Sequence, residues 1–428
     1  MRIDVVCESI GACLIRRGAM DLSPVEFGER SRLAVLLDRL SVVEDDREPH
    51  RVAYPLQEIL LLSVCGTIAD CDDYDDIAAW GKAHLEFLRR FLPFYHGVPC
   101  GRWLTVMMNR VNPALFSACF SDWVRACWPD HPELVAIDGK TLRRSHDRSV
   151  DQPALHLVSA FATTSGLVLG QEAVRDKANE LSAIPVLLER LAADGGLRGA
   201  VVSIDAIACN GAIAQCIRDA AADYLLAVKA NQPSLRRDVE AGFNEAAAET
   251  LDGFASVDKG HGRIEHRHVK VLREVAWLSG NRRFPGELRL PDVAAIIKVE
   301  SRTELRDRSR FDTRYFVTSA HLDAQQAAAM VRCHWAIENR LHWTLDVTFA
   351  EDQSRLRKGH GAKNMAVIRH FAINHIRQAD EPVQPPNAGL TRRTKKPKAP
   401  QRTSIKSRRK RASWAVDYLA TVLNAKIR

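Results

Sequence analysis

Apolar residues recur at the spacing of an α-helix through the first third of the chain. The stretches between these segments are rich in Asp, Gly and Pro, which favour turns. The pattern predicts a helical N-terminal domain over residues 24–128, preceded by a variable N-terminus at residues 1–23. From the pattern alone, such helices could form a packing or dimerisation module. The helical segments are 24–40, 54–70, 75–92 and 112–128.

From residue 129 to residue 232 the pattern changes to short apolar runs separated by helical segments. Three runs, a helix, a fourth run, a second helix and a fifth run follow in that order. This order is expected of an α/β fold with a ribonuclease-H-like mixed sheet flanked by helices. In such a sheet the first and fourth strands lie side by side at the centre. The predicted strands are 134–138, 156–161, 167–169, 200–205 and 224–229, and the predicted helices are 179–193 and 211–221.

Residues 233–322 show alternating apolar and polar positions, which predict an all-β insertion. A helix over residues 323–346 then returns the chain to the catalytic core, which comprises residues 129–232 and 323–380. Residues 381–428 form a basic tail followed by a C-terminal helix that we expect to dock on the core.

Two of the apolar runs end in an aspartate, Asp138 and Asp205, and the helix at 323–346 carries Glu338. The carboxyl ends of neighbouring parallel strands meet at one edge of a sheet, where functional groups gather. On a helical repeat Glu338 shares a face with Leu341 and Leu345, so we expect its carboxylate to point inward. Taken singly, Asp138 could belong to a hairpin turn and Glu338 to a solvated helix face.

Three carboxylates that converge at one site repel one another unless a cation lies between them. Oxygen ligands of this kind suit Mg²⁺ or Mn²⁺, the metals of phosphoryl transfer. The three acids together therefore predict a metal site.

The sequence around these acids resembles a known family, the H-repeat-associated (ISAs-type) insertion-sequence transposases. That family belongs to the larger group with a ribonuclease-H-like core and an Asp-Asp-Glu triad. The resemblance covers nearly the whole chain from about residue 25. The motifs that carry it are AIDGKTLRRS at 136–145, SIDAIACN at 203–210, DYLLAVKANQ at 223–232, GHGRIE at 260–265 and HWAIENRLHWTLDVTFAED at 334–352.

The resemblance implies that Asp138, Asp205 and Glu338 are the catalytic residues and the metal ligands. Two Mg²⁺ ions, with Mn²⁺ as a possible substitute, would serve strand cleavage and strand transfer at the ends of an insertion sequence. The partners would be double-stranded DNA, both element ends and target, and a second copy of the chain in a DNA-bound homodimer. The resemblance also implies DNA binding by the helical N-terminal domain.

Two other functions stay open from the sequence. The stretch from Gly97 to Trp103 and the residue Asn210 depart from the family pattern. The chain could therefore be a domesticated DNA-binding protein that no longer transposes. A metal-dependent nuclease that acts alone is the other alternative.

Composition agrees with a cytoplasmic, nucleoid-associated protein without a membrane partner. The chain has 428 residues, of which 46% are hydrophobic, enough for a sizeable core. It shows neither a long apolar run nor a signal-peptide pattern. Its ten cysteines form no CxxC pair, so reduced thiols are expected.

The net charge of +8 is unevenly distributed, because residues 391–411 contain eleven Lys or Arg and no acid. Removing these eleven charges leaves the rest of the chain near −3 (8 minus 11). We interpret the run as a flexible loop that follows DNA phosphates, with a solvated linker as the alternative. Further basic residues flank the predicted metal site and suit contacts to phosphate. The candidate DNA contacts are Lys140, Arg143, Arg144, Lys229, His334, Arg355, Arg357, Lys358, Arg408, Arg409, Lys410 and Arg411.

Overall fold

A computed structural model describes most of the chain. The described residues are 31–129, 133–147, 151–174, 179–260, 262–278, 284, 287–379 and 403–424. None of the described helices is both long and apolar enough to cross a membrane. All eight cysteines among these residues are free thiols.

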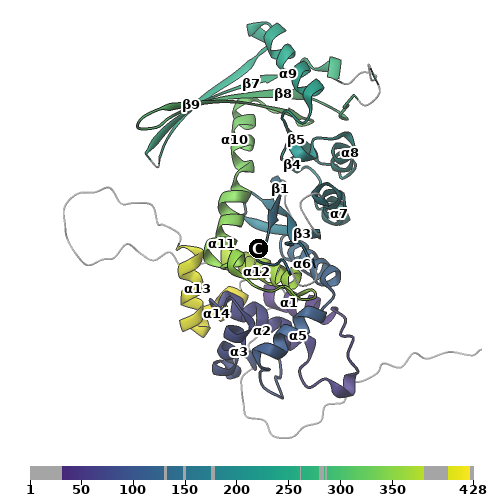
Figure 1. Ribbon diagram of the computed structural model, residues 1–428, viewed down its shortest axis with the longest axis vertical. Helices are drawn as coiled ribbons and strands as arrows, with labels where there is room; N and C mark the ends of the chain where they lie inside the picture. The colour runs from purple at the N-terminus through teal and green to yellow at the C-terminus, as the bar shows by residue number, and fades with distance from the viewer. Residues whose placement is uncertain are drawn as a thin grey trace, which may run out of the picture.

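The N-terminal part contains six α-helices, which fill the lower part of Figure 1. The second of them, α2, buries all of its residues except Gln57, and a helix that is apolar all round belongs inside a protein. It packs against α12, a helix of the C-terminal part. The N-terminal helices therefore share one core with distant segments. Their bounds are α1 Arg32–Ser41, α2 Leu56–Ile68, α3 Tyr74–Ala83, α4 Leu85–Leu88, α5 Gly101–Arg110 and α6 Pro113–Cys127, and α12 spans Gly361–Gln378.

The central sheet has the strand order β3-β2-β1-β4-β5 in its first half. Strand β1 pairs parallel to β4 and antiparallel to β2, and β5 pairs parallel to β4. The order of strands and helices predicted from the sequence is confirmed. The elements are β1 Leu134–Thr141, β2 His156–Ala162, β3 Leu167–Val174, α7 Glu180–Ala192, β4 Val201–Ile204, α8 Gly211–Asp219 and β5 Asp223–Val228.

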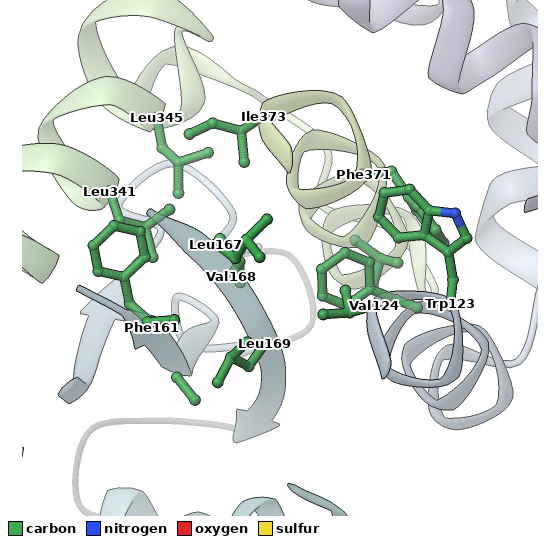
Figure 2. Packing of buried hydrophobic residues seen from close by; sticks show 14 of the residues in the cluster. Trp123, Val124, Phe161, Leu167, Val168, Leu169, Leu341, Leu345, Phe371 and Ile373 are labelled. Atoms are coloured by element: carbon green, nitrogen blue, oxygen red, sulfur yellow. The ribbon is translucent and has the colours of Figure 1, made fainter. Parts of the chain in front are cut away.

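Helices α6 and α12 cover the sheet near β2 and β3 with large apolar side chains. Figure 2 shows Trp123 of α6 beside Phe371 of α12, with ring centroids 5.0 Å apart. Leu167 and Phe161 face this cluster from the sheet, and Leu341 reaches it from the segment that carries Glu338. The core therefore connects the N-terminal helices, the sheet and the glutamate-bearing segment.

The region 233–322 differs from the prediction of an all-β insertion. It begins with a helix, α9, which covers part of the sheet, and the helix is followed by four strands. These strands do not form a sheet of their own. Strand β9 pairs with β5, so the order continues as β9-β8-β7-β6 in one nine-stranded sheet that curves away at the top of Figure 1. The elements are α9 Pro233–Glu245, β6 Asp252–Gly260, β7 Arg263–Leu272, β8 Ala295–Glu304 and β9 Ser309–Thr318.

The C-terminal part of the basic run is a helix and not the flexible loop that we predicted. Helix α13, Ile405–Trp414, contains Arg408 and Arg409, and the helix that follows, α14, Val416–Asn424, buries an apolar face on the core as predicted. Residues 391–402 lie outside the described residues.

The prediction that Arg408 and Arg409 contact DNA is corrected, because both side chains are buried. The Arg409 guanidinium is fully enclosed and donates to the carbonyl oxygens of Thr67 and Cys71. It also pairs with Asp72 at 2.9 Å and lies 4.2 Å from the ring centroid of Phe349. These contacts of the Arg409 guanidinium connect α13 to the end of α2. Lys410 and Arg411 remain exposed.

We expect Arg409→Ala to lower the free energy of unfolding by about 3 kcal/mol or more, because two buried carbonyls would lose their donor. The matched change Lys410→Ala, at the exposed neighbouring position, should stay within about 0.5 kcal/mol of wild type. Chemical denaturation followed by circular dichroism measures both. Equal stability of the two variants would contradict the structural role of Arg409.

Candidate active site

The parallel pairing of β1 with β4 sets the positions of the two aspartates. In this register Ile137 lies opposite Ile204, so Asp138 and Asp205 follow at the same end of adjacent strands. Asp138 continues along β1, whereas the strand ends at Ile204 and a short 3₁₀ turn begins after Asp205. The two carboxylates therefore come from the centre of the sheet.

Glu338 lies on a segment that is not the single helix predicted over 323–346. Helix α10, Ala324–His334, is followed by a π-helical segment, Ile337–His342, and then by α11, Trp343–Thr348. In the π segment the N–H of Trp343 donates to the carbonyl of Glu338, five residues earlier. Such segments have a wider turn than an α-helix and are frequent at functional sites.

The residues around Glu338 differ in their exposure. Leu341 and Leu345 are buried as predicted, but Glu338 itself is exposed. Its carboxylate forms neither a hydrogen bond nor an ion pair with other described residues.

Asp138, Asp205 and Glu338 line one cleft of about 370 Å³ between the sheet and α10. Lys229 and Trp335 also line this cleft. Within the described part of the chain, no group of three or more His, Cys, Asp or Glu side chains is gathered closely enough to hold a metal ion. The three acids thus share a cleft without forming a completed ligand set.

The environment of Asp138 disfavours its charge. Burial, followed by the nearby charges of Glu338, Glu180 and Asp205, raises the pKa of Asp138 to about 7. His342 Nδ1 lies 3.6 Å from Asp138 Oδ2. Because burial lowers the pKa of His342 to about 4, this imidazole is neutral near pH 7 and does not compensate the carboxylate.

Asp205 has a partner, since Lys229 Nζ donates to both of its carboxylate oxygens at 2.8 and 2.9 Å. Burial would raise the pKa of Asp205, but the hydrogen bonds and charge of Lys229 outweigh it and lower the pKa. The loop after β5 is fixed beside Asp205 by Asn231, which donates to the Ala206 carbonyl at 2.8 Å. Lys229, a predicted DNA contact, is thus positioned at the cleft and exposed.

His334 also lies at the cleft, where its Nδ1 is 2.9 Å from the hydroxyl of Ser203. Ser203 is a buried residue of β4, so this hydrogen bond fastens the end of α10 to the sheet. Burial lowers the pKa of His334, which keeps the ring neutral near pH 7. In this structure His334 therefore acts as a tether.

The prediction that Lys140 contacts DNA is also corrected, because only 11% of its side chain is exposed. Its ammonium group pairs with Asp346 and, at 2.5 Å, with Glu351. Glu351 is buried and also lies 3.5 Å from Arg369 of α12. Burial opposes the charge of Glu351, but Lys140 and Arg369 lower its pKa to about 2. Lys140 thus connects β1 with the segment after Glu338.

The remaining predicted DNA contacts near the site lie at the surface. Arg143, Arg144, Arg355 and Lys358 are exposed, and Arg357 is half-buried. Arg357 Nε donates to the carbonyl of Arg144 at 3.1 Å, so the two basic segments, distant in sequence, lie together.

A buried pair beside Asp138 was not identified from the sequence as part of the site geometry. His156 Nε2 lies 3.1 Å from Glu180 Oε2, and both side chains are buried. A Cβ added at Gly139 would lie only 2.3 Å from His156 Nε2 and 2.8 Å from Glu180 Oε1. The glycine after Asp138 therefore leaves the space in which this pair packs against β1.

A mixed sheet whose cleft gathers acidic side chains is typical of enzymes that act on phosphate esters with a divalent metal ion. Comparison with known families specifies the class further. Residues 129–375 match the family described as Transposase DDE domain, and residues 37–124 match the family described as DDE_Tnp_1-associated. The chain belongs to the DDE transposases, a family of DNA-acting enzymes that use divalent metal ions.

The chain is also similar to individual proteins. The chain is 35% identical to the "H repeat-associated putative transposase YhhI" of Escherichia coli K12, over 80% of this chain and 90% of that protein. It is 36% identical to the "Uncharacterized protein in dhlA 3'region" of Xanthobacter autotrophicus, over 63% of this chain and 89% of that protein. A piggyBac transposase synaptic complex with hairpin DNA superimposes with a TM-score of 0.40 and 9% identity, covering 96% of this chain and 85% of that one. A TM-score this low does not establish a shared fold.

We expect Gly139→Ala to destabilise the protein by about 1–3 kcal/mol, because the new methyl group would displace the buried His156–Glu180 pair. The matched control is Gly253→Ala on β6, where a Cβ would meet nothing within 4 Å. Thermal unfolding compares the two variants. If Gly139→Ala melted like Gly253→Ala, the pair would not depend on a glycine at this position.

Proposed function

We propose that this transposase cleaves and joins DNA strands with Mg²⁺ bound by Asp138, Asp205 and Glu338 on a ribonuclease-H-like core. The supporting observation is the strand register, in which Asp138 and Asp205 follow at the same end of adjacent strands. Glu338, on the π-helical segment after α10, lines the same cleft. Two ions are proposed, as in other sites of in-line phosphoryl transfer, and Mn²⁺ is a substitute.

The donor chemistry of these residues fits a divalent cation. All three side chains offer carboxylate oxygens, which Mg²⁺ prefers. The raised pKa of Asp138 shows that its charge is not balanced by the surrounding protein, so a bound cation would relieve the cost. Glu338 is exposed and without a partner among the described residues, so its carboxylate is available for binding.

When bound, the metal ions would lower the pKa of the attacking hydroxyl and stabilise charge on the phosphate. Asp138 and Asp205 would hold their positions through the sheet, and Glu338 would close the ligand set from the opposite wall. Lys229 would leave Asp205 once a cation binds there and would then be free to pair with a DNA phosphate. Arg143, in the basic surface beside the cleft, would hold the DNA backbone.

Cutting and rejoining an element requires both of its ends at once, so we propose that the chain works as a dimer on DNA. Of the alternatives, a purely DNA-binding role is disfavoured by the retained acids of the cleft, and the family relationship does not favour a nuclease that acts alone. Light scattering of the complex with DNA tests the dimer directly.

Replacing any one of the three acids by its amide should lower strand cleavage by roughly a thousandfold, because one charge that holds the metal is lost. The variants are Asp138→Asn, Asp205→Asn and Glu338→Gln, assayed on a supercoiled plasmid that carries the gene with its native flanking DNA. Affinity for DNA should persist, since phosphate contacts come from Lys and Arg. Ca²⁺ should support binding but little cleavage.

The matched control is Asp312→Asn, because Asp312 also lines the cleft but already pairs with Arg314 at 2.6 Å. It should retain cleavage within a few-fold of wild type. Normal cleavage by all three amide variants would refute the proposed site, and an equal loss in Asp312→Asn would indicate a general effect of charge in the cleft.

A further inference from the structure

A second groove, of about 850 Å³, lies between the outer part of the sheet and α10. Its floor is formed by alternate residues of β7, β8 and β9, which point to one face of the sheet. In the strand register Glu265, Thr303 and Arg310 form one row across the three strands. Arg267, Ser301 and Asp312 form the next row toward the core, and Val269, Val299 and Arg314 form the third.

The chemistry of this face changes along the strands. Val269 and Val299 are buried against α10, as expected for a sheet face covered by a helix. Beyond them the face becomes polar and charged where the helix no longer covers it. A surface of this kind is suited to a ligand with many charges and not to a further apolar layer of the protein.

The groove carries an excess of positive charge that the protein does not balance. Six arginines and two acids line it, and a third acid, Asp258, serves two of the arginines at once. The formal excess is therefore three charges (6 minus 3). Arg263 and Arg310 are exposed and form neither an ion pair nor a hydrogen bond with other described residues. The lining arginines are Arg263, Arg267, Arg310, Arg314, Arg332 and Arg340.

The groove is continuous with the acidic cleft. Arg314, Val331 and Trp335 line both. At the junction the guanidinium of Arg314 lies 5.0 Å from the ring centroid of Trp335 and pairs at 2.6 Å with Asp312, which also lines both spaces. A chain of phosphates could therefore pass from the groove to Glu338 without leaving the protein surface.

We infer that this arginine-lined groove binds the phosphodiester backbone of the DNA strand that adjoins the cleaved bond. The inference rests on the proposed function, since it assigns the path of the DNA that the cleft would cut. Spaced arginines recognise phosphates by charge and by bidentate hydrogen bonds, independently of base sequence. The phosphodiester backbone is the ligand that matches a long groove with unpaired arginines.

Charge neutralisation tests this assignment. The double variant Arg263→Ala/Arg310→Ala removes the two arginines that lack partners among the described residues, so folding should be little affected. Its affinity for a fluorescein-labelled duplex of mixed sequence should fall on the order of tenfold, and the slope of log affinity against log salt should decrease by about 1.8. The control Arg302→Ala/Arg306→Ala removes the same charge from the opposite face of β8 and the turn after it. It should bind like wild type.

A native thiol allows the position of the DNA to be measured. Cys333 is exposed and lines the groove, whereas Cys100, also exposed, begins α5 in the N-terminal part. DNA with a disulfide-tethered linker close to the cleavage position should cross-link to the wild-type protein and to Cys100→Ser. It should not cross-link to Cys333→Ser.

The outcomes separate this inference from the proposed function. If Arg263→Ala/Arg310→Ala kept the wild-type affinity and salt slope, the groove would not be the DNA-binding site. Cross-linking that persisted in Cys333→Ser would lead to the same conclusion. In either case, metal-dependent cleavage would still support the proposed function of the cleft. Cross-linking at Cys333 should persist in Asp138→Asn. If cross-linking occurred but no metal ion supported cleavage by wild type, the groove would stand and the catalytic proposal would fail.

Discussion

The repulsion between carboxylates held at the end of a parallel strand pair is the constraint on which the site depends. The register of β1 and β4 leaves Asp138 and Asp205 no freedom to separate, because their backbones are part of the central sheet. The protein surrounds the two carboxylates differently: Lys229 pairs with Asp205, while burial, followed by neighbouring acids, raises the pKa of Asp138 to about 7 beside a neutral His342. In the proposed function, a divalent cation bound by the acids would balance the charge of Asp138.

Buried ion pairs keep the surrounding elements in place. Lys140, two residues after Asp138, reaches Glu351, and Glu351 reaches Arg369 of α12. Arg409 also connects distant elements, because it joins α13 to the end of α2. Each pair connects segments that are far apart in the sequence. Because an isolated charge in the interior is costly, the partners must stay together, and the segment that carries Glu338 is held against the sheet.

The strands after β5 make the outer sheet and the cleft parts of one structure. Pairing of β9 with β5 continues the hydrogen-bonded ladder from the aspartates to the arginine-lined groove. Helix α10 packs over this outer sheet and then leads to Glu338 through the π-helical segment. DNA held in the groove would therefore be positioned relative to the acids by rigid elements, which suits a reaction that needs in-line geometry.

The sequence by itself determined the order of strands and helices in the core and the place of both aspartates at strand ends. These follow from local apolar periodicity, which burial imposes on each element separately. It did not identify α9, although Leu235, Val239 and Phe243 recur at helical spacing, nor β6, in which every residue is partly or fully exposed. Only the tertiary structure decided which charges face solvent: Lys140 and Arg409 look like DNA contacts in the sequence, yet distant carboxylates and carbonyls enclose them. It also decided the π-helical register at Glu338 and the groove, whose arginines come from β7, β9, α10 and the π-helical segment. Contacts between distant segments decide such features, and no local pattern records them.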